Sequence, residues 1–337
     1  MPDSTTLAAA AAPGWFDNLS TSFNAVLPLF LCILLGMFLR RIGLLQENIR
    51  QSLNKLCFKV FLPIYLFNNI YEIKDISQVF DPVLILFACT SLLAVFGLLM
   101  VLIPRVEKED SRRGLMIQAM FRSNFALFGL PLAEMLCGDL IGPTSLLLGL
   151  TVPIYNILAV ISLETFHHDP NGGGTSVRKI LRGIATNPLI IASLLGILFY
   201  FLKTEAGLIL PEALHKNTLV KLGGVATPLS LIALGGQFVF SSVKEFRFQL
   251  TLTVLIKLVV MPVIMVLIGV ALGFRNEFLV PIMIMYGAPT AVSSYPMAQQ
   301  MGGDGDLAAA SVVFTSGFAI LTIFLLIFGL KSFGLIL

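Results

Sequence analysis

Long apolar runs alternate with short polar breaks along most of the chain. Ten such runs lie near residues 23–42, 52–71, 82–104, 113–137, 143–166, 184–203, 219–240, 249–273, 277–301 and 307–330. A run of about 20 apolar residues crosses the hydrocarbon core of a bilayer as an α-helix. Barrel strands would instead give short alternating segments. The pattern predicts an all-α polytopic membrane protein with ten transmembrane helices.

Composition supports this interpretation. Hydrophobic residues make up 57% of the chain and charged residues 12%, with a mean hydropathy of +0.92. A soluble domain carries about 25% charged residues. Residues 1–22 lack the basic segment of a signal peptide and are interpreted as a flexible tail. No basic cluster suggests a nucleic-acid partner. The four cysteines lie in or beside apolar runs without metal-ligand spacing, which favours buried thiols and predicts no metal site.

The basic residues in the breaks predict the orientation. The breaks after odd-numbered spans hold Arg40, Arg41, Arg50, Arg105, Lys108, Arg112, Arg113, Arg178, Lys179, Arg182, Lys244 and Arg247. The opposite side holds only Lys74, Lys203, Lys216, Lys221, Arg275 and Lys331. Because cytoplasmic loops carry the excess of Lys and Arg, we expect both termini outside and the central linker, residues 167–178, in the cytoplasm. The Asn187–Pro188 pair then caps and opens the sixth span.

The two halves of the chain match at an offset of 165 residues. Residues 131–139 (PLAEMLCGD) align with 296–304 (PMAQQMGGD), with the Pro, an Ala, a Gly and the Asp identical. Each half, 23–166 and 179–337, contains five spans. Because five is odd, the second half enters the membrane from the opposite face. This predicts a 5+5 inverted repeat, which is typical of secondary transporters with a substrate site near the midplane.

Spans 4 and 9 are the expected places for broken helices. Span 4 contains Gly129 and Pro131, and span 9 contains Gly287, Pro289 and Pro296. Proline removes a backbone donor and glycine adds backbone freedom. The windows 124–131 and 289–296 coincide at the repeat offset, so the two breaks should face each other. Simple proline kinks without a site are the alternative.

A buried cation at the first break favours an anionic substrate. Arg122 lies near the middle of span 4, where a charge is costly and usually pairs or lines a pathway. Half-helices beginning at a break also point their positive dipole ends toward it. The alternative is that Arg122 pairs with Glu134 or Glu164 and only holds the bundle. The candidate substrate-binding residues are Arg122, Ser123, Asn124, Pro289, Thr290, Ser293 and Ser294. Lys257 is a second buried cation, and Tyr155 is a weaker candidate.

The sequence lacks the residues that several other kinds of activity require. No span centre holds a pair of carboxylates, so coupling to protons or sodium through such a pair is not indicated. There is no phosphate-binding loop for an ATP motor, and no nucleophile–base arrangement appears in the spans. We therefore expect neither an enzyme nor a cofactor.

The residues in spans 4 and 9 resemble one family. Asn124, Gly129 and Pro131 followed by Gly138, together with Pro289, Ala298, Gly303 and Asp304, are similar to the motifs of the auxin efflux carrier family. This family includes plant auxin exporters and bacterial malate permease-like proteins. Ser123 and Thr290 depart from the plant pattern, which has Pro and Gln there, and the central linker is far shorter. These departures argue against auxin itself.

The resemblance implies a site where spans 4 and 9 cross, with Asn124 contacting the substrate and Pro289 marking the second crossing. Spans 3–5 and 8–10 would form a moving transport unit, and spans 1, 2, 6 and 7 a scaffold that forms a homodimer. The implied substrates are small organic anions, mono- or dicarboxylates, moved across the plasma (bacterial inner) membrane. A non-transporting sensor that binds a ligand in the same cavity is the alternative, and a channel is a further one.

Overall fold

The computed structural model describes residues 27–28, 31–72, 81–137, 140, 142–167, 177–237 and 244–336. Within these residues the backbone is almost entirely helical, and the only extended pairing is a single bridge between Ser123 and Thr290. The predicted all-α architecture is therefore confirmed. The expected tail, residues 1–22, and most of the central linker lie outside the described residues.

The helices follow the predicted runs closely. After a helix at residues 31–41 they are α2 (Glu47–Leu56), η1 (Cys57–Phe61), α3 (Leu62–Tyr71), α4 (Pro82–Val106), α5 (Asp110–Phe121), η3 (Phe125–Gly129), α6 (Leu130–Cys137), α7 (Gly142–Thr165), α8 (Val177–Thr186), α9 (Pro188–Ala206), η4 (His215–Val220), α10 (Lys221–Gln237), α12 (Arg247–Leu255), η5 (Ile256–Val260), α13 (Met261–Ala271), α14 (Asn276–Gly287), α15 (Ser294–Gln300) and α16 (Gly305–Ser332). The η segments are π-helical turns.

Six of the described helical runs are long and apolar enough to cross a membrane: 82–106, 142–165, 188–206, 215–237, 247–271 and 305–332. Their outer faces are apolar as well. Leu98 on α4, Leu267 on α13 and Leu325 on α16 are all more than half exposed. Such a surface is suited to lipid rather than to water. Asn187 caps α9 as expected, its side chain accepting from the amide of Leu189 over 2.9 Å.

Two prolines inside the long helical runs, Pro63 and Pro262, follow widened turns. The π-helical turn η1 ends two residues before Pro63, and η5 ends two residues before Pro262. Proline donates no backbone hydrogen bond and clashes with the preceding turn of an α-helix. A π-turn relieves this clash because its hydrogen bonds span one more residue. The helical path therefore continues through both prolines.

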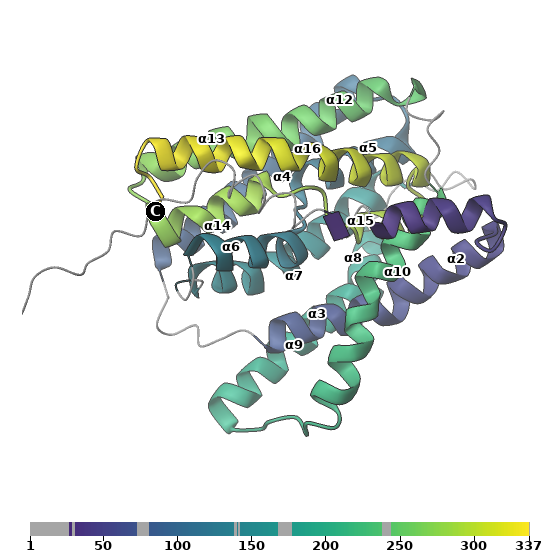
Figure 1. Ribbon diagram of the computed structural model, residues 1–337, viewed down its shortest axis with the longest axis horizontal. Helices are drawn as coiled ribbons and strands as arrows, with labels where there is room; N and C mark the ends of the chain where they lie inside the picture. The colour runs from purple at the N-terminus through teal and green to yellow at the C-terminus, as the bar shows by residue number, and fades with distance from the viewer. Residues whose placement is uncertain are drawn as a thin grey trace, which may run out of the picture.

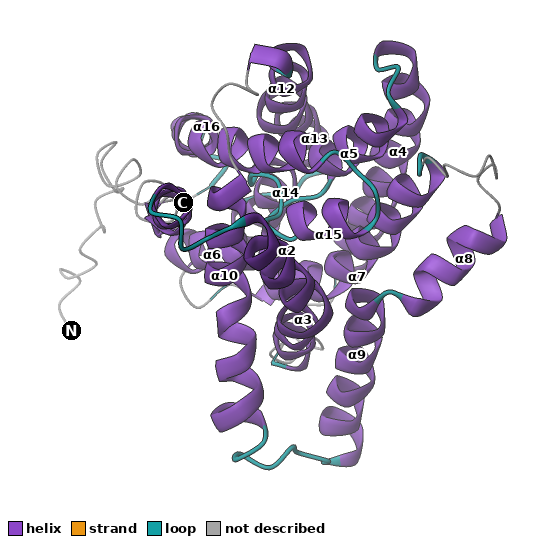
Figure 2. Cartoon of the chain, turned by 90° about the vertical axis from the view of Figure 1, so that its right-hand side faces the viewer, coloured by secondary structure: helices purple, strands orange, loops and turns teal. Residues whose placement is uncertain are grey.

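The helices pack as two groups. In the first, α3 packs against α9 and α10, and α2 packs against α10. In the second, α5 packs against α4 and α7, α13 against α14, and α16 against α12 and α15. Figure 1 shows the first group below and to the right of the second. Figure 2 shows α9 and α10 projecting away from the second group, joined at their far ends by a loop.

Two glycines let helix 31–41 lie directly on α10. A Cβ at Gly36 would stand 2.1 Å from the carbonyl oxygen of Ile232, and one at Gly235 would stand 2.0 Å from that of Ile33. The two contacts are reciprocal, each glycine facing the backbone of the other helix. Small residues permit such close approach between membrane helices, where dispersion contacts replace the hydrophobic effect.

Candidate substrate site

Two short non-helical segments interrupt the second group and bond to each other. The first, residues 122–124, follows α5, and the second, residues 288–293, follows α14. The amide of Asn124 donates to the carbonyl of Pro289 over 2.8 Å, and that of Ala291 donates to the carbonyl of Arg122 over 3.3 Å. The pairing is antiparallel and is centred on Ser123 and Thr290. Backbone groups that leave the helices therefore find partners inside the protein, as a membrane interior requires.

Hydroxyl groups of each segment cap the helix that ends at the other. Ser123 Oγ donates to the carbonyl of Met285, two residues before the end of α14. Thr290 Oγ1 donates to the carbonyl of Ala119 over 2.7 Å, two residues before the end of α5. The last carbonyls of a helix have no partner within it. Each interruption thus donates a hydrogen bond to a carbonyl group at the end of the helix that leads into the other interruption.

The prolines and glycines named from the sequence border these segments. Gly287 is the last residue of α14 and Gly129 the last of η3, whereas Pro131 lies within α6 and Pro296 within α15. The extended backbone therefore precedes both prolines instead of spanning the windows up to them. Pro296 is the third residue of α15, where its missing amide costs little, and Pro131 follows the π-helical turn η3 by two residues, as Pro63 follows η1. A Cβ at Gly129 would stand 2.4 Å from Ile284 Cγ2, so this glycine permits close packing on α14.

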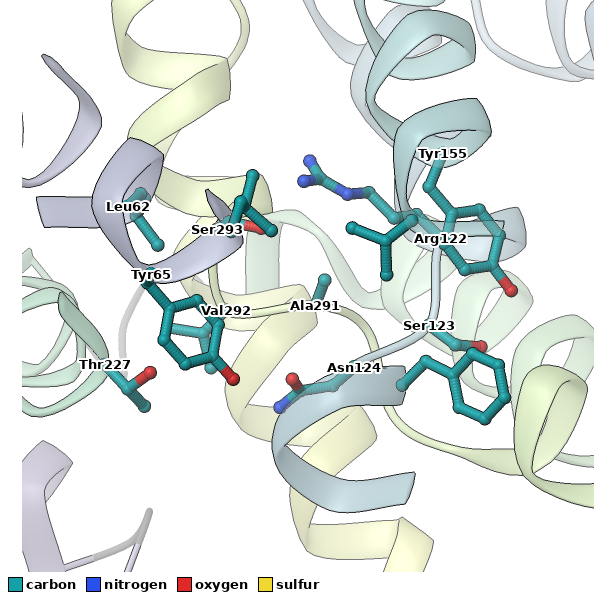
Figure 3. A pocket seen from close by; sticks show the side chains of 13 residues that line it. Leu62, Tyr65, Arg122, Ser123, Asn124, Tyr155, Thr227, Ala291, Val292 and Ser293 are labelled. Atoms are coloured by element: carbon teal, nitrogen blue, oxygen red, sulfur yellow. The ribbon is translucent and has the colours of Figure 1, made fainter. Parts of the chain in front are cut away.

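A cavity of about 50 Å³ opens beside the paired segments, where α3, α7 and α10 approach them (Figure 3). A buried water needs roughly 10–15 Å³ of such space, so this volume admits a few waters. One part of the lining is polar and the other apolar. The lining residues are Leu62, Tyr65, Leu66, Arg122, Ser123, Asn124, Phe125, Val152, Tyr155, Thr227, Ala291, Val292 and Ser293.

Asn124 offers a hydrogen-bond donor to this cavity. Its side chain is 5% exposed, and its Nδ2 has no hydrogen-bond partner among the described residues. Its backbone is fully used, because the amide donates to Pro289 and the carbonyl accepts from Phe128. Figure 3 shows the amide nitrogen directed into the space between the segments and α3. A buried donor without a partner is costly, and a bound ligand or water is one explanation for it.

Arg122 is buried, and its hydrogen bonds go to neutral groups. Its guanidinium donates to Met297 Sδ over 3.1 Å and to Asn156 Oδ1 over 2.6 Å. The side chain is 3% exposed. Figure 3 shows the guanidinium directed away from Asn124, although the residue lines the cavity. The charge of Arg122 therefore acts on the cavity mainly through space.

Lys257 lies directly behind the first segment. It is fully buried in η5, and its Nζ donates to Ser123 Oγ. Ser123 Oγ in turn donates to Met285, so a chain of hydrogen bonds links Lys257 to the end of α14. A second buried cation thus stands next to the cavity, behind one of its lining residues. The buried lysine was visible in the sequence, but its contact with Ser123 required the fold.

The structure brings some of the predicted site residues together and leaves others outside. Arg122, Ser123, Asn124 and Ser293 line the cavity, whereas Pro289, Thr290 and Ser294 do not. Thr290 is occupied in capping α5.

Sequence reasoning missed the contribution of other helices, above all Tyr65 of α3 and Thr227 of α10. Each lies within two residues of a proline inside a predicted span, Pro63 or Pro228. This proximity is the feature of the sequence that could have pointed to both residues.

Comparison with known proteins supplies the evolutionary context. The sequence pattern of a family described as membrane transport protein matches residues 21–327. An uncharacterized transporter from Methanothermobacter thermautotrophicus is 26% identical over 86% of this chain and 92% of its own length. A second uncharacterized transporter, from Methanocaldococcus jannaschii, is 22% identical over 89% of this chain and 96% of its own length.

Proposed function

The chain belongs to the membrane transport protein family that includes the auxin efflux carriers, and we propose that it is a secondary carrier of small organic acid anions. It is a multi-pass integral membrane protein, and both relatives are named as transporters. The proposal adds the substrate class and the mechanism, which is alternating access.

The unpartnered amide of Asn124 is the observation that carries this proposal. Its Nδ2 lies in a cavity near two buried cationic side chains, Arg122 and Lys257. The helical run 125–137 also begins at the cavity, and a helix N-terminus favours negative charge. A carboxylate bound there would accept a hydrogen bond from the Asn124 amide and would be attracted by both cations. The apolar part of the lining, Leu62, Leu66 and Val292, suits the carbon body of such an acid.

The register of the paired segments supports the inverted repeat. Asn124 and Pro289 correspond at the 165-residue offset, and they are also hydrogen-bonded to each other. An antiparallel pair of equivalent residues is the arrangement expected where a pseudo-two-fold axis crosses the chain. We therefore propose ten spans in two inverted halves, with helices 4 and 9 broken and crossing here.

The small cavity indicates how the carrier works. Ligand sites usually measure about 300–1,000 Å³, whereas this cavity measures about 50 Å³. The two helix groups must therefore move apart to admit an organic acid. We propose that α4–α7 and α12–α16 form the transport unit. Helix 31–41, α2, α3, α9 and α10 form the scaffold through which a homodimer assembles. By the basic-residue count, the central linker is cytoplasmic.

Uptake by the purified full-length chain in liposomes tests the proposal. A panel of mono- and dicarboxylates, with empty liposomes as background, should reveal saturable uptake of at least one acid. Asn124→Ala and Arg122→Gln should each reduce this uptake while the protein stays monodisperse and its melting temperature stays close to that of the parent. Undiminished uptake by Arg122→Gln would exclude the through-space role of its charge. Saturable binding without uptake of any acid would favour a sensor over a carrier.

A further inference from the structure

A second, larger cavity lies along the same helices as the substrate cavity. It measures about 770 Å³, and its lining is mainly polar: Glu47, Arg50 and Lys55 from α2, Gln299 from α15, Asp304 at the N-cap of α16 and Asp306 in its first turn. This space, called the vestibule below, falls on the side that the basic-residue count assigns to the cytoplasm. Its volume is within the range of ordinary ligand sites.

The same two stretches of chain line both cavities. On the run Glu47–Tyr71, Arg50 and Lys55 face the vestibule, while Leu62 and Tyr65 face the substrate cavity. On the second stretch, Ser293 faces the substrate cavity and Gln299 the vestibule. The residues between these positions therefore separate the two spaces. Tyr295 is one of these residues, and Asn54, next to Lys55 on the first stretch, donates a hydrogen bond to it; both are fully buried.

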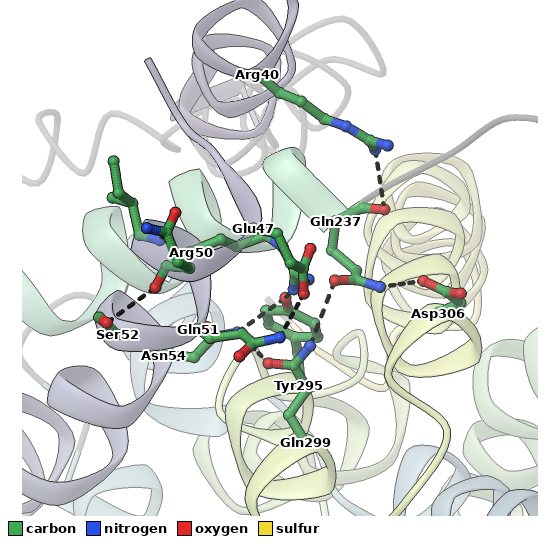
Figure 4. Close-up of polar contacts among 12 residues, drawn as sticks. Arg40, Glu47, Arg50, Gln51, Ser52, Asn54, Gln237, Tyr295, Gln299 and Asp306 are labelled. Atoms are coloured by element: carbon green, nitrogen blue, oxygen red, sulfur yellow. Dashed lines mark hydrogen bonds and ion pairs between the residues drawn. The ribbon is translucent and has the colours of Figure 1, made fainter. Parts of the chain in front are cut away.

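Between the two cavities, a cluster of hydrogen bonds joins α2 to α15 (Figure 4). The hydroxyl oxygen of Tyr295 accepts from Arg50 Nη1 and from Asn54 Nδ2, each over 2.9 Å. Asn54 Nδ2 also donates to Gln299 Oε1, one helical turn further along α15. Every one of these bonds joins α2, in the first helix group, to α15, in the second. Gln237 of α10 extends the cluster to Gln299 and to Asp306 of α16.

The cluster is built so that it can open at low cost. Arg50 also pairs with Glu47 on its own helix, and the Glu47 side chain is 65% exposed. When α15 moves away, Arg50 therefore keeps a counter-ion and gains water from the vestibule. Gln51 donates to the same carboxylate over 2.6 Å and helps to hold it in place. A buried cation that lost its only partner would resist such a movement.

We propose that Arg50, Asn54, Tyr295 and Gln299 form a gate that closes the substrate cavity from the vestibule, and that the vestibule is the path by which substrate reaches the gate. The inference rests on the proposed carrier function and assigns one side of its alternating access to named residues. Release of the Tyr295 hydroxyl joins the two cavities into one passage.

Thiol accessibility tests the gate without any need for a transported substrate. Ser293→Cys places a thiol in the substrate cavity, called the cavity thiol, and Ser52→Cys places one in the vestibule, called the vestibule thiol. A charged, water-soluble methanethiosulfonate is added to the solubilised full-length chain, and labelling by the parent, with its native cysteines, is subtracted. Tyr295→Phe removes the hydroxyl that accepts hydrogen bonds from Arg50 and Asn54. The bond from Arg50 is charged and is the larger loss, so the cavity thiol should react roughly tenfold faster or more. The vestibule thiol should react at the same rate in both backgrounds.

Tyr286→Phe is the matched control. It removes a buried hydroxyl whose 2.6 Å bond to Ser91 lies wholly inside the second group. An equal rate for the cavity thiol in the parent, in Tyr295→Phe and in Tyr286→Phe would overturn the gate. If Tyr295→Phe does not fold, Arg50→Met removes the charged donor to the Tyr295 hydroxyl, and an unchanged rate has the same meaning. The carrier function and the gate can fail separately. If no variant takes up any acid but Tyr295→Phe still exposes the cavity thiol, the carrier function is rejected and the gate is retained.

Discussion

Asn124 and Pro289 stand 165 positions apart and are hydrogen-bonded to each other, the Asn124 amide donating to the Pro289 carbonyl over 2.8 Å. The same offset aligns the two halves of the sequence. The Ala291 amide donates to the Arg122 carbonyl in return, so the two segments run antiparallel. The substrate cavity lies beside this pair, so both halves contribute to one site.

Replacement of Lys257 by methionine should strongly reduce uptake without loss of folding. Lys257 is fully buried against Ser123, and a methionine of similar length fills the same space without a charge. Because a buried cation is costly, we expect the thermal midpoint to stay equal or rise. Uptake should fall at least tenfold, since an anionic substrate loses a nearby cation. Lys59→Met, at an exposed position of η1, should leave uptake at the parent level. Normal uptake by Lys257→Met would show that its charge has no part in substrate binding.

Removal of one reciprocal cap should destabilise the junction of the two interruptions. Thr290→Val is nearly isosteric and leaves the carbonyl of Ala119 without its 2.7 Å donor. An unsatisfied buried polar group costs about 1–3 kcal/mol. We expect a clearly lower midpoint of thermal unfolding in detergent. Thr322→Val removes a hydroxyl that bonds only within its own helix, to Phe318 and Ala319, and should shift the midpoint little. Equal midpoints for the two variants would contradict the capping role.

Glu107 should make stability depend on pH in acid. It lies between α4 and α5, and burial raises its pKa, but the amides of Glu109 and Lys108 and the side chain of Gln249 outweigh burial and leave the pKa below its ordinary value. A lowered pKa means that the ionised carboxylate stabilises the fold above the unfolded value, about 4.3, and that this contribution is lost as pH falls through the folded pKa.

Glu107→Gln should therefore melt at a lower temperature than the parent at pH 7, and the difference should shrink below about pH 4. Thermal midpoints measured across this range test the expectation. Glu205→Gln, at an exposed position of α9, should give no difference at any pH. A gap between Glu107→Gln and the parent that persists at about pH 3, below the unfolded value, would assign the effect to packing instead of charge.

Substitution of Gly235 should separate helix 31–41 from α10. An alanine Cβ there would stand 2.0 Å from the carbonyl oxygen of Ile33, closer than real contacts permit, so the helices must shift. Gly224, on the same helix, has nothing within 4 Å of its Cβ position. Gly224→Ala should be neutral or slightly stabilising, because alanine favours helix by about 1 kcal/mol. Gly235→Ala should lower the thermal midpoint strongly. Similar midpoints for both alanine variants would refute the close approach.

The helical, membrane-embedded architecture and the position of the two interruptions along the chain can be predicted from the amino-acid sequence. Both are local properties, because a bilayer demands apolar helices of fixed length, and Pro and Gly change the backbone where they stand. The predicted windows of broken helix differ in detail from the observed non-helical segments. Pro131 and Pro296 lie inside helical segments, and the extended backbone comes before them.

The side chains that share the cavity, and those that separate it from the vestibule, become apparent only in the folded protein. Tyr65 and Thr227 reach the cavity from helices far from it in sequence, and Arg50 meets Tyr295 across 245 positions. Whether Thr290 faces substrate or caps α5 depends on where the opposite helix ends, which no local pattern encodes. Hydrogen bonding has a reach of about 3 Å, so these roles exist only once the fold has placed each donor against its acceptor.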